Sequence, residues 1–146
     1  MARGVTVLLT AFAGGLVALQ APINSMLGRA IGTWQAAFLS FAIGTLLLLA
    51  IAMLSGGLGS LADAGAPGPV YLLGGVLGAA YVTTVLVTVR TLGAGGVTAA
   101  TIAGQLTVSL VVDQLGILGV EKSPITVVKL LGVVFLTLGV VLIVRD

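Results

Sequence analysis

The chain has 146 residues, of which 59% are hydrophobic and only 7% are charged, and its net charge is +2. A soluble domain carries about 25% charged residues, so this composition indicates a multi-pass membrane protein. The sequence contains no cysteine and no histidine, which excludes disulfides, thiol or imidazole catalysis and the common zinc sites. With so few acids and so small a net charge, we expect no metal, no cofactor, no enzymatic activity and no nucleic-acid partner.

Charged residues divide the sequence into long apolar segments that we interpret as five transmembrane helices. Each segment is close to the ~20 residues that span a bilayer. The expected fold class is therefore an all-α integral membrane protein, with residues 1–146 forming a single transmembrane domain. The predicted helices cover residues 4–27, 33–55, 69–91, 97–119 and 125–144.

The first predicted helix is interrupted by a proline. Pro22 removes one backbone hydrogen bond and is expected to kink the helix. Gln20 and Asn24 lie one turn apart on either side of it. Two interpretations follow: Asn24 ends the helix near the membrane interface, or a kinked, polar helix end lines a cavity.

The second and third predicted helices carry aromatic and small residues. Trp34 is expected at the membrane interface, as an anchor in preference to a ligand contact. Gly74 and Gly78 form a face that permits close backbone approach. Tyr81 is a cavity candidate because its hydroxyl requires a partner. The short segment 92–96 is predicted to be a tight turn between the third and fourth helices, which would form an antiparallel hairpin.

The fourth predicted helix carries a polar stripe. Asp113 is the only acid inside any long apolar segment, and an acid at the bilayer centre costs about 2.5–3.5 kcal/mol, less off-centre. We expect it either to serve transport or to be stabilised locally, near Lys122 or Lys129. The stripe recurs every four residues and consists of Thr101, Gln105, Ser109 and Asp113.

The fifth predicted helix begins after a short polar turn. Ser123 is expected to cap it, with Pro124 in its first turn. Gly132 and Gly139 lie seven residues apart on one face, where small residues let two helices approach. We therefore predict that this face makes dimer contacts.

The positive charges are balanced across the predicted membrane. One side carries three and the other also three, so the positive-inside bias that fixes orientation is absent. We expect insertion in both orientations and an antiparallel dimer, as in transporters built from inverted repeats. The alternative is that one charge outweighs the count and fixes a single orientation. The two sets are Arg3, Lys122 and Lys129, and Arg29, Arg90 and Arg145.

Three stretches resemble the YdcZ-type family of the drug/metabolite transporter superfamily. They are Gln20–Leu46, Gly74–Tyr81 and Ala103–Gly119, of which the Asn24–Gly28 region and the Gly104-Gln105…Asp113 helix are the most specific. The closing helix, LLGVVFLTLGVVLI, also has the glycine spacing of the dimerising helix in small multidrug resistance proteins. The resemblance implies a drug/metabolite-transporter-like fold in a bacterial inner membrane, with two copies in inverted orientation around a substrate cavity.

One departure separates the chain from the small multidrug resistance proteins. Those proteins use a membrane-embedded Glu in the first helix to bind both proton and cation. Here the first helix has no acid, only Gln20 and Asn24. Proton-coupled export of cationic drugs is therefore not carried over, and Asp113 is the one acid left for proton coupling.

The leading hypothesis is a small transporter that moves a small polar or amphipathic solute by alternating access. It would work within membrane lipid as an antiparallel homodimer, or with a paralogous partner. The competing hypothesis is a non-transporting membrane subunit that assembles with a larger partner. The candidate cavity residues are Gln20, Asn24, Tyr81, Gln105, Ser109 and Asp113.

Overall fold

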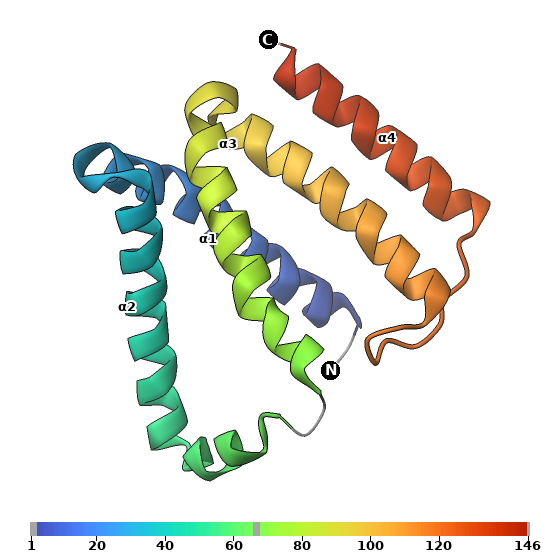
Figure 1. The fold of residues 1–146 in the computed structure, drawn as a ribbon. Coiled ribbons are helices and arrows are strands. Elements are labelled where there is room, and N and C mark those ends of the chain that lie inside the picture. Colours follow the sequence, from blue (N-terminus) through green and yellow to red (C-terminus); the bar gives the residue numbers. More distant parts are fainter. Residues whose placement is uncertain (1–2, 66–67, 146) are drawn as a thin grey trace. The chain divides into compact units, whose positions relative to one another are not determined.

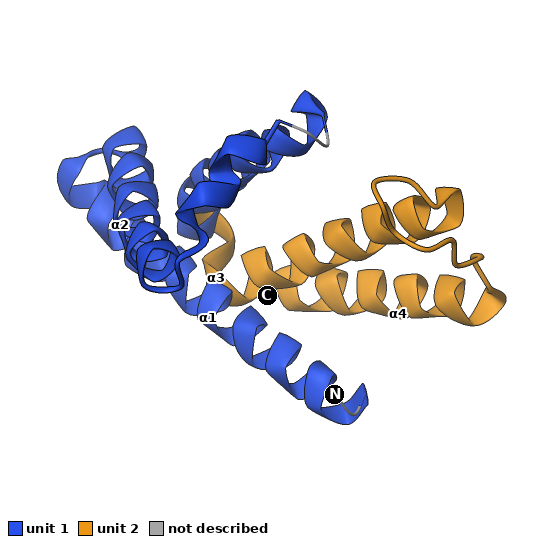
Figure 2. Cartoon of the chain, turned by 90° about the horizontal axis from the view of Figure 1, so that it is seen from below, with its two compact units in different colours: residues 1–90 blue, residues 91–146 orange. Residues whose placement is uncertain are grey.

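The computed structural model describes residues 3–65 and 68–145 of the chain. It separates into two compact units, Met1–Arg90 and Thr91–Asp146 (Figure 2). The first unit contains α1, α2, two short 3₁₀ helices and the beginning of α3. The second contains the remainder of α3 and all of α4. That residues 1–146 form a single transmembrane domain stays a prediction.

Long apolar helices make up most of the described chain (Figure 1). Four helical segments in this part of the chain are long and apolar enough to cross a bilayer, which confirms the all-α integral membrane class. The principal helices are α1 (Arg3–Ile31), α2 (Thr33–Leu54), α3 (Leu73–Leu115) and α4 (Val127–Val144), with the 3₁₀ helices η1 (Gly57–Asp63) and η2 (Pro69–Leu72) between α2 and α3.

Helix α1 is longer than the sequence indicated. It continues through Pro22 and past Asn24 to Ile31, so the interpretation in which Asn24 ends the helix is wrong. The helix stops at Gly32, whose φ of 99° is accessible to glycine and costly for other residues. Gly32 is the single residue between α1 and α2.

Small residues bring α1, α2 and the first part of α3 together in the first unit. Ala36 and Leu86 are fully buried, and Ala37 and Val82 complete the core cluster. A Cβ added at Gly28 would lie 3.1 Å from Leu86 Cδ2 and 3.7 Å from Ala36 Cβ. The absence of a side chain at Gly28 therefore lets the three helices meet at this level.

Helix α3 contains a break that divides it into two arms. Gly93 has φ 68° and ψ 171°, outside the helical region, within an otherwise helical stretch of 43 residues. The predicted helices 69–91 and 97–119 therefore belong to one segment interrupted at a single residue, and the expected turn at 92–96 is reduced to Gly93. The first arm begins at Leu73 because Pro69–Leu72 forms a 3₁₀ turn with proline at its start.

In the second unit, the arm formed by residues 94–115 lies beside α4 and runs in the opposite direction (Figures 1 and 2). A Cβ added at Gly96 would lie 3.5 Å from Val144 Cγ2, so the arm's start packs on the end of α4. The arm ends at Gly116, which has φ 63° and donates its N–H to the Val112 carbonyl. A glycine in this left-handed conformation commonly terminates a helix.

The N-cap of α4 is a different residue from the one predicted. Thr126 has extended backbone, and its Oγ1 accepts a hydrogen bond from Lys129 N at 3.3 Å. Thr126 is therefore the N-cap, and the expected cap Ser123 and the following Pro124 lie in the preceding loop. The helix begins at Val127, two residues after the expected start at 125.

Candidate functional site

Three of the predicted cavity residues line one small cavity in the first unit. Gln20 and Asn24 come from α1, and Tyr81 comes from α3. Four-residue spacing places Gln20 and Asn24 on the same helix face. The cavity has a volume of about 10 Å³, which is room for about one water molecule. Apolar side chains complete the lining: Val17, Ala21, Val82, Val85 and Leu86.

Asn24 is the buried polar residue of this cavity, with only 6% of its surface exposed. Its Oδ1 accepts a hydrogen bond from Ser40 Oγ at 3.2 Å. Since Ser40 belongs to α2, this bond links two helices and satisfies a polar group inside an apolar unit. Among residues 3–65 and 68–145 the Asn24 amide N–H groups donate to no protein atom, so they are available for a further partner.

Sequence reasoning missed Ser40. The signal was present in its spacing, because Ala36 and Ala37 precede Ser40 by four and three residues, which places these small residues on one helix face. A stripe of small residues that includes one hydroxyl is a feature of packed membrane helices.

Tyr81 and Gln20 supply the remaining polar groups of the cavity. Tyr81 is half-buried and packs against the core cluster. Within residues 3–65 and 68–145, its hydroxyl makes no hydrogen bond to the protein. Gln20 is exposed. The cavity therefore combines a buried amide, a free phenol and an accessible amide, all without charge.

The other three predicted cavity residues lie in the second unit. Gln105 and Ser109 are exposed, and Asp113 is half-buried. They follow one another at four-residue intervals along the second arm of α3, as the sequence predicted. The structure thus groups the six candidates as three in each unit.

Asp113 lies where the second arm of α3 meets the loop before α4. Its backbone carbonyl accepts a hydrogen bond from Ser123 N at 2.8 Å. The neighbouring Gln114 side chain accepts one from Ile125 N at 2.6 Å. Both bonds tie the loop to the helix end, but neither uses the Asp113 carboxylate.

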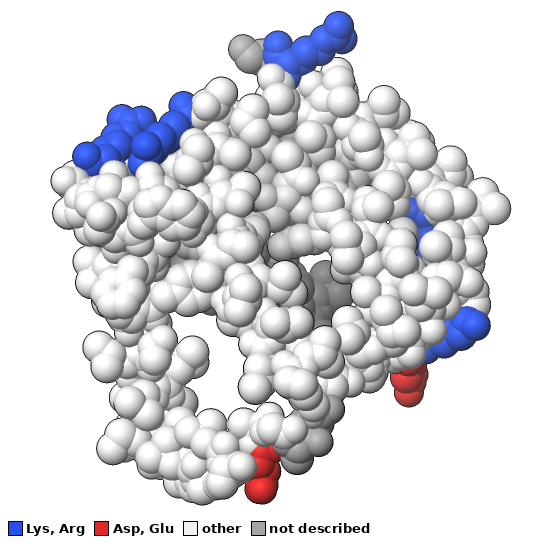
Figure 3. Space-filling model, viewed as in Figure 1, with Lys and Arg blue, Asp and Glu red and all other residues white. Residues whose placement is uncertain are grey.

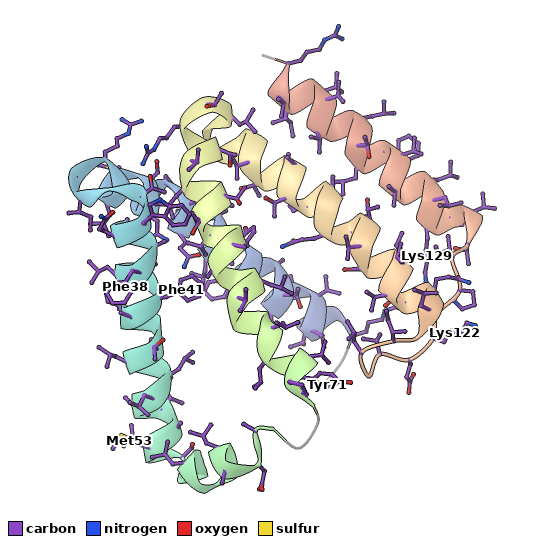
Figure 4. All side chains as sticks on the ribbon, in the orientation of Figure 1. Phe38, Phe41, Met53, Tyr71, Lys122 and Lys129 are labelled. Carbon is purple, nitrogen blue, oxygen red and sulfur yellow. The ribbon has the colours of Figure 1, made fainter. Side chains whose placement is uncertain are left out.

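Lys129, labelled in Figure 4, donates hydrogen bonds to the loop before α4. Lys129 Nζ donates to Ser123 Oγ at 2.8 Å and to the Pro124 carbonyl at 3.1 Å. In the described part of the chain, the Asp113 carboxylate forms no ion pair with Lys122 or Lys129. The local stabilisation expected for Asp113 is therefore not found in that form.

A larger groove lies between α2 and the first arm of α3. Its volume is about 690 Å³, within the range of ligand-sized pockets. Trp34 and Phe38 are both 74% exposed, and Phe41 lies on the side of α2 that faces α3 (Figure 4). A Cβ added at Gly78 would lie 3.5 Å from the Phe41 ring. The lining residues are Trp34, Ala37, Phe38, Phe41, Val76, Ala79, Ala80, Thr83 and Thr84.

The glycine face of α4 is open. Gly132 is exposed and Gly139 is half-buried. A Cβ added at either position would meet no atom within 4 Å. Neither glycine is therefore required for packing within the described chain.

One comparison identifies a relationship with known proteins. A family model described as "Putative inner membrane exporter, YdcZ" matches residues 5–142 of the chain. No curated protein and no solved structure gives a match.

Proposed function

Because the chain belongs to the YdcZ family of inner membrane transport proteins, we propose that it carries a small polar or amphipathic solute by alternating access. The observation that carries the proposal is the convergence of Gln20, Asn24 and Tyr81 on one cavity. These side chains donate and accept hydrogen bonds without bearing charge. Such a lining suits a neutral polar group attached to an apolar body.

The size of the cavity fits an occluded form of a transporter. At about 10 Å³ it accommodates water but no solute. Alternating access requires the binding space to open and close as helices move. The Ser40–Asn24 hydrogen bond, at 3.2 Å, is compatible with such a change. Breaking one interhelical hydrogen bond costs little free energy, and a hydrogen bond from Asn24 to the substrate would offset that loss.

Five membrane crossings agree with the dimensions of α3. A straight helix of 43 residues would be ~65 Å long, about twice the thickness of a bilayer core. Divided at Gly93, it yields two arms of about 30 Å each. An odd number of crossings with three positive charges on each side supports insertion in both orientations, and hence an antiparallel dimer.

Asp113 is the proposed site of proton coupling. It is half-buried in an apolar segment and forms no ion pair within the described residues. The cost of a lone acid in the membrane favours a functional use for it. Gln105 and Ser109 precede it at four-residue intervals on the same face of α3 and are the further polar candidates of the second unit.

The second candidate function is that of a non-transporting subunit. It is favoured by the open glycine face at Gly132 and Gly139, which a larger membrane partner could cover as well as a second copy. Assembly alone, however, requires neither a polar cavity nor Asp113. The two functions differ in whether the purified protein moves solute by itself.

The test is solute uptake by the purified protein in liposomes, screened electrically on a supported membrane. Asn24→Ala and Tyr81→Phe should each reduce the transport current for any active solute by at least about ten-fold. Thr137→Val is the matched control, because the Thr137 hydroxyl donates only to its own helix, at Val133 O. Wild-type protein that moves no solute at all, while purifying with a larger partner, would favour the subunit.

A further inference from the structure

The corner between α1 and α2 concentrates positive charge beside the mouth of the α2–α3 groove. Arg29 occupies the last turn of α1. Arg90 Nη2 lies 3.0 Å from a Cβ position built on Gly28, the residue next to Arg29. Blue atoms gather at this corner of the space-filling view (Figure 3).

Arg90 has hydrogen-bonding capacity to spare. Its Nη2 donates to Thr33 Oγ1 at 3.3 Å, which uses one of the five N–H groups of a guanidinium. In residues 1–90 the sequence has a single acid, Asp63. That acid lies beyond the far end of α2, a helix of 22 residues and so ~33 Å long. The two arginines therefore have no acidic partner in their own unit.

The groove begins at this same corner. On α2, Trp34 follows Thr33 directly and starts the lining that continues at Phe38 and Phe41. On α3, Val76, Thr83 and Arg90 are spaced by seven residues and share one helix face. Both walls of the groove thus lead to the guanidinium of Arg90. The positively charged corner therefore lies beside one end of the apolar groove, whose volume is about 690 Å³.

We propose that this corner and groove bind one membrane phospholipid with an anionic headgroup. Arg29, Arg90 and the Thr33 hydroxyl take the phosphate, and an acyl chain lies between the aromatic residues of α2 and the small residues of α3. The charge complementarity selects the occupant, because an anionic headgroup neutralises the arginines while its acyl chain fills the apolar groove. Basic pockets between membrane helices bind lipid headgroups in this way. The inference is independent of the transport proposed above.

Native mass spectrometry of the full-length protein in detergent tests the proposal. Phosphatidylglycerol should bind more tightly than phosphatidylcholine with the same acyl chains. The double substitution Arg29→Gln/Arg90→Gln should weaken phosphatidylglycerol binding about twenty-five-fold, at about five-fold per arginine. The charge-matched control Lys122→Gln/Arg145→Gln should leave it unchanged. Arg29→Lys/Arg90→Lys keeps the charge and should retain the preference, which separates loss of binding from loss of fold.

The groove is tested by a filling substitution. Ala80→Phe should reduce binding of both lipids, whereas Ala50→Phe, an exposed position of α2 outside the groove, should not. Equal binding of the two lipids, or equal losses in the glutamine variant and its control, would overturn the proposal. Complete competition by inorganic phosphate would indicate a free-anion site instead. A change of oligomeric state by Ala80→Phe with lipid binding intact would assign the groove to a second copy.

Discussion

Ser40 Oγ on α2 donates a hydrogen bond to Asn24 Oδ1 on α1 at 3.2 Å. The bond joins two helices at a buried position in an otherwise apolar unit. Interhelical hydrogen bonds in membrane proteins contribute about 0.6–2 kcal/mol. Asn24 also lines the small cavity beside Gln20 and Tyr81, so the bond holds in place a side chain of the proposed solute site.

Ser40→Ala should therefore lower the free energy of unfolding by about 1 kcal/mol, since it removes the partner of the Asn24 oxygen. Thermal unfolding in detergent measures the change. Ser60→Ala is the control, because Ser60 is exposed and its hydroxyl donates only to Gly57 O within η1. Equal effects of the two substitutions would show that the helix-to-helix bond contributes no stability.

Gly28→Leu should destabilise the first unit by about 1–3 kcal/mol through overpacking. The new side chain would collide with Leu86 and Arg90, whose atoms lie 3.1 and 3.0 Å from the Cβ position. A Cβ added at Gly14 on the same helix meets no atom within 4 Å, so Gly14→Leu should be neutral. Denaturant unfolding measures the free energy of unfolding of both variants. Equal values for Gly28→Leu and Gly14→Leu would contradict the prediction.

Reporters fused after Asp146 should give comparable signals from both sides of the membrane. The reason is the balance of three positive residues against three, which leaves orientation undetermined. Two added lysines on one side should bias the signal strongly. A one-sided signal from the unmodified chain would exclude the antiparallel homodimer. The remaining possibilities would be a parallel dimer or an oppositely oriented paralogue as partner.

Gly132→Leu/Gly139→Leu should shift the protein from dimer toward monomer in detergent while leaving the chain folded. Both positions are open within the chain, so the added side chains would obstruct only a partner helix. Light scattering coupled to chromatography measures the mass. If the variant remains fully dimeric, the dimer contact lies elsewhere. Gly74, where an added Cβ also meets no atom within 4 Å, is then the next candidate.

Asp113→Asn should leave stability within about 0.5 kcal/mol of wild type, since the carboxylate makes no hydrogen bond or ion pair in the described structure. Transport, or its pH dependence, should be lost if Asp113 carries the proton. Melting temperature and solute uptake are measured on the same preparation. An unstable variant whose folded fraction transports normally would make Asp113 a structural residue.

Hydropathy and charge were sufficient to predict the membrane class and the approximate helices. Apolar length specifies a spanning helix almost independently of tertiary contacts. Helix ends were less well predicted, because they depend on local conformations such as those of Gly32 and Gly116. Thr126 caps α4, whereas Ser123 lies in the preceding loop, where its hydroxyl accepts from Lys129.

The candidate site was predictable only in part. Helical spacing placed Gln20 and Asn24 together, but it gave no means of pairing α1 with α2 and so missed Ser40. The corner formed by Arg29, Thr33 and Arg90 was also not predicted. It depends on a contact between Thr33 and Arg90, which are 57 positions apart in the sequence. Sequence periodicity reports faces of single helices, whereas sites form where faces from several helices meet.

Gly32 also limits how α1 and α2 can move. A single residue separates the end of α1 from the start of α2, and its φ of 99° is one that glycine adopts readily. One residue provides no flexible linker, so a displacement of the end of α1 would also displace the start of α2. Lengthening this link should allow the two helices to move separately.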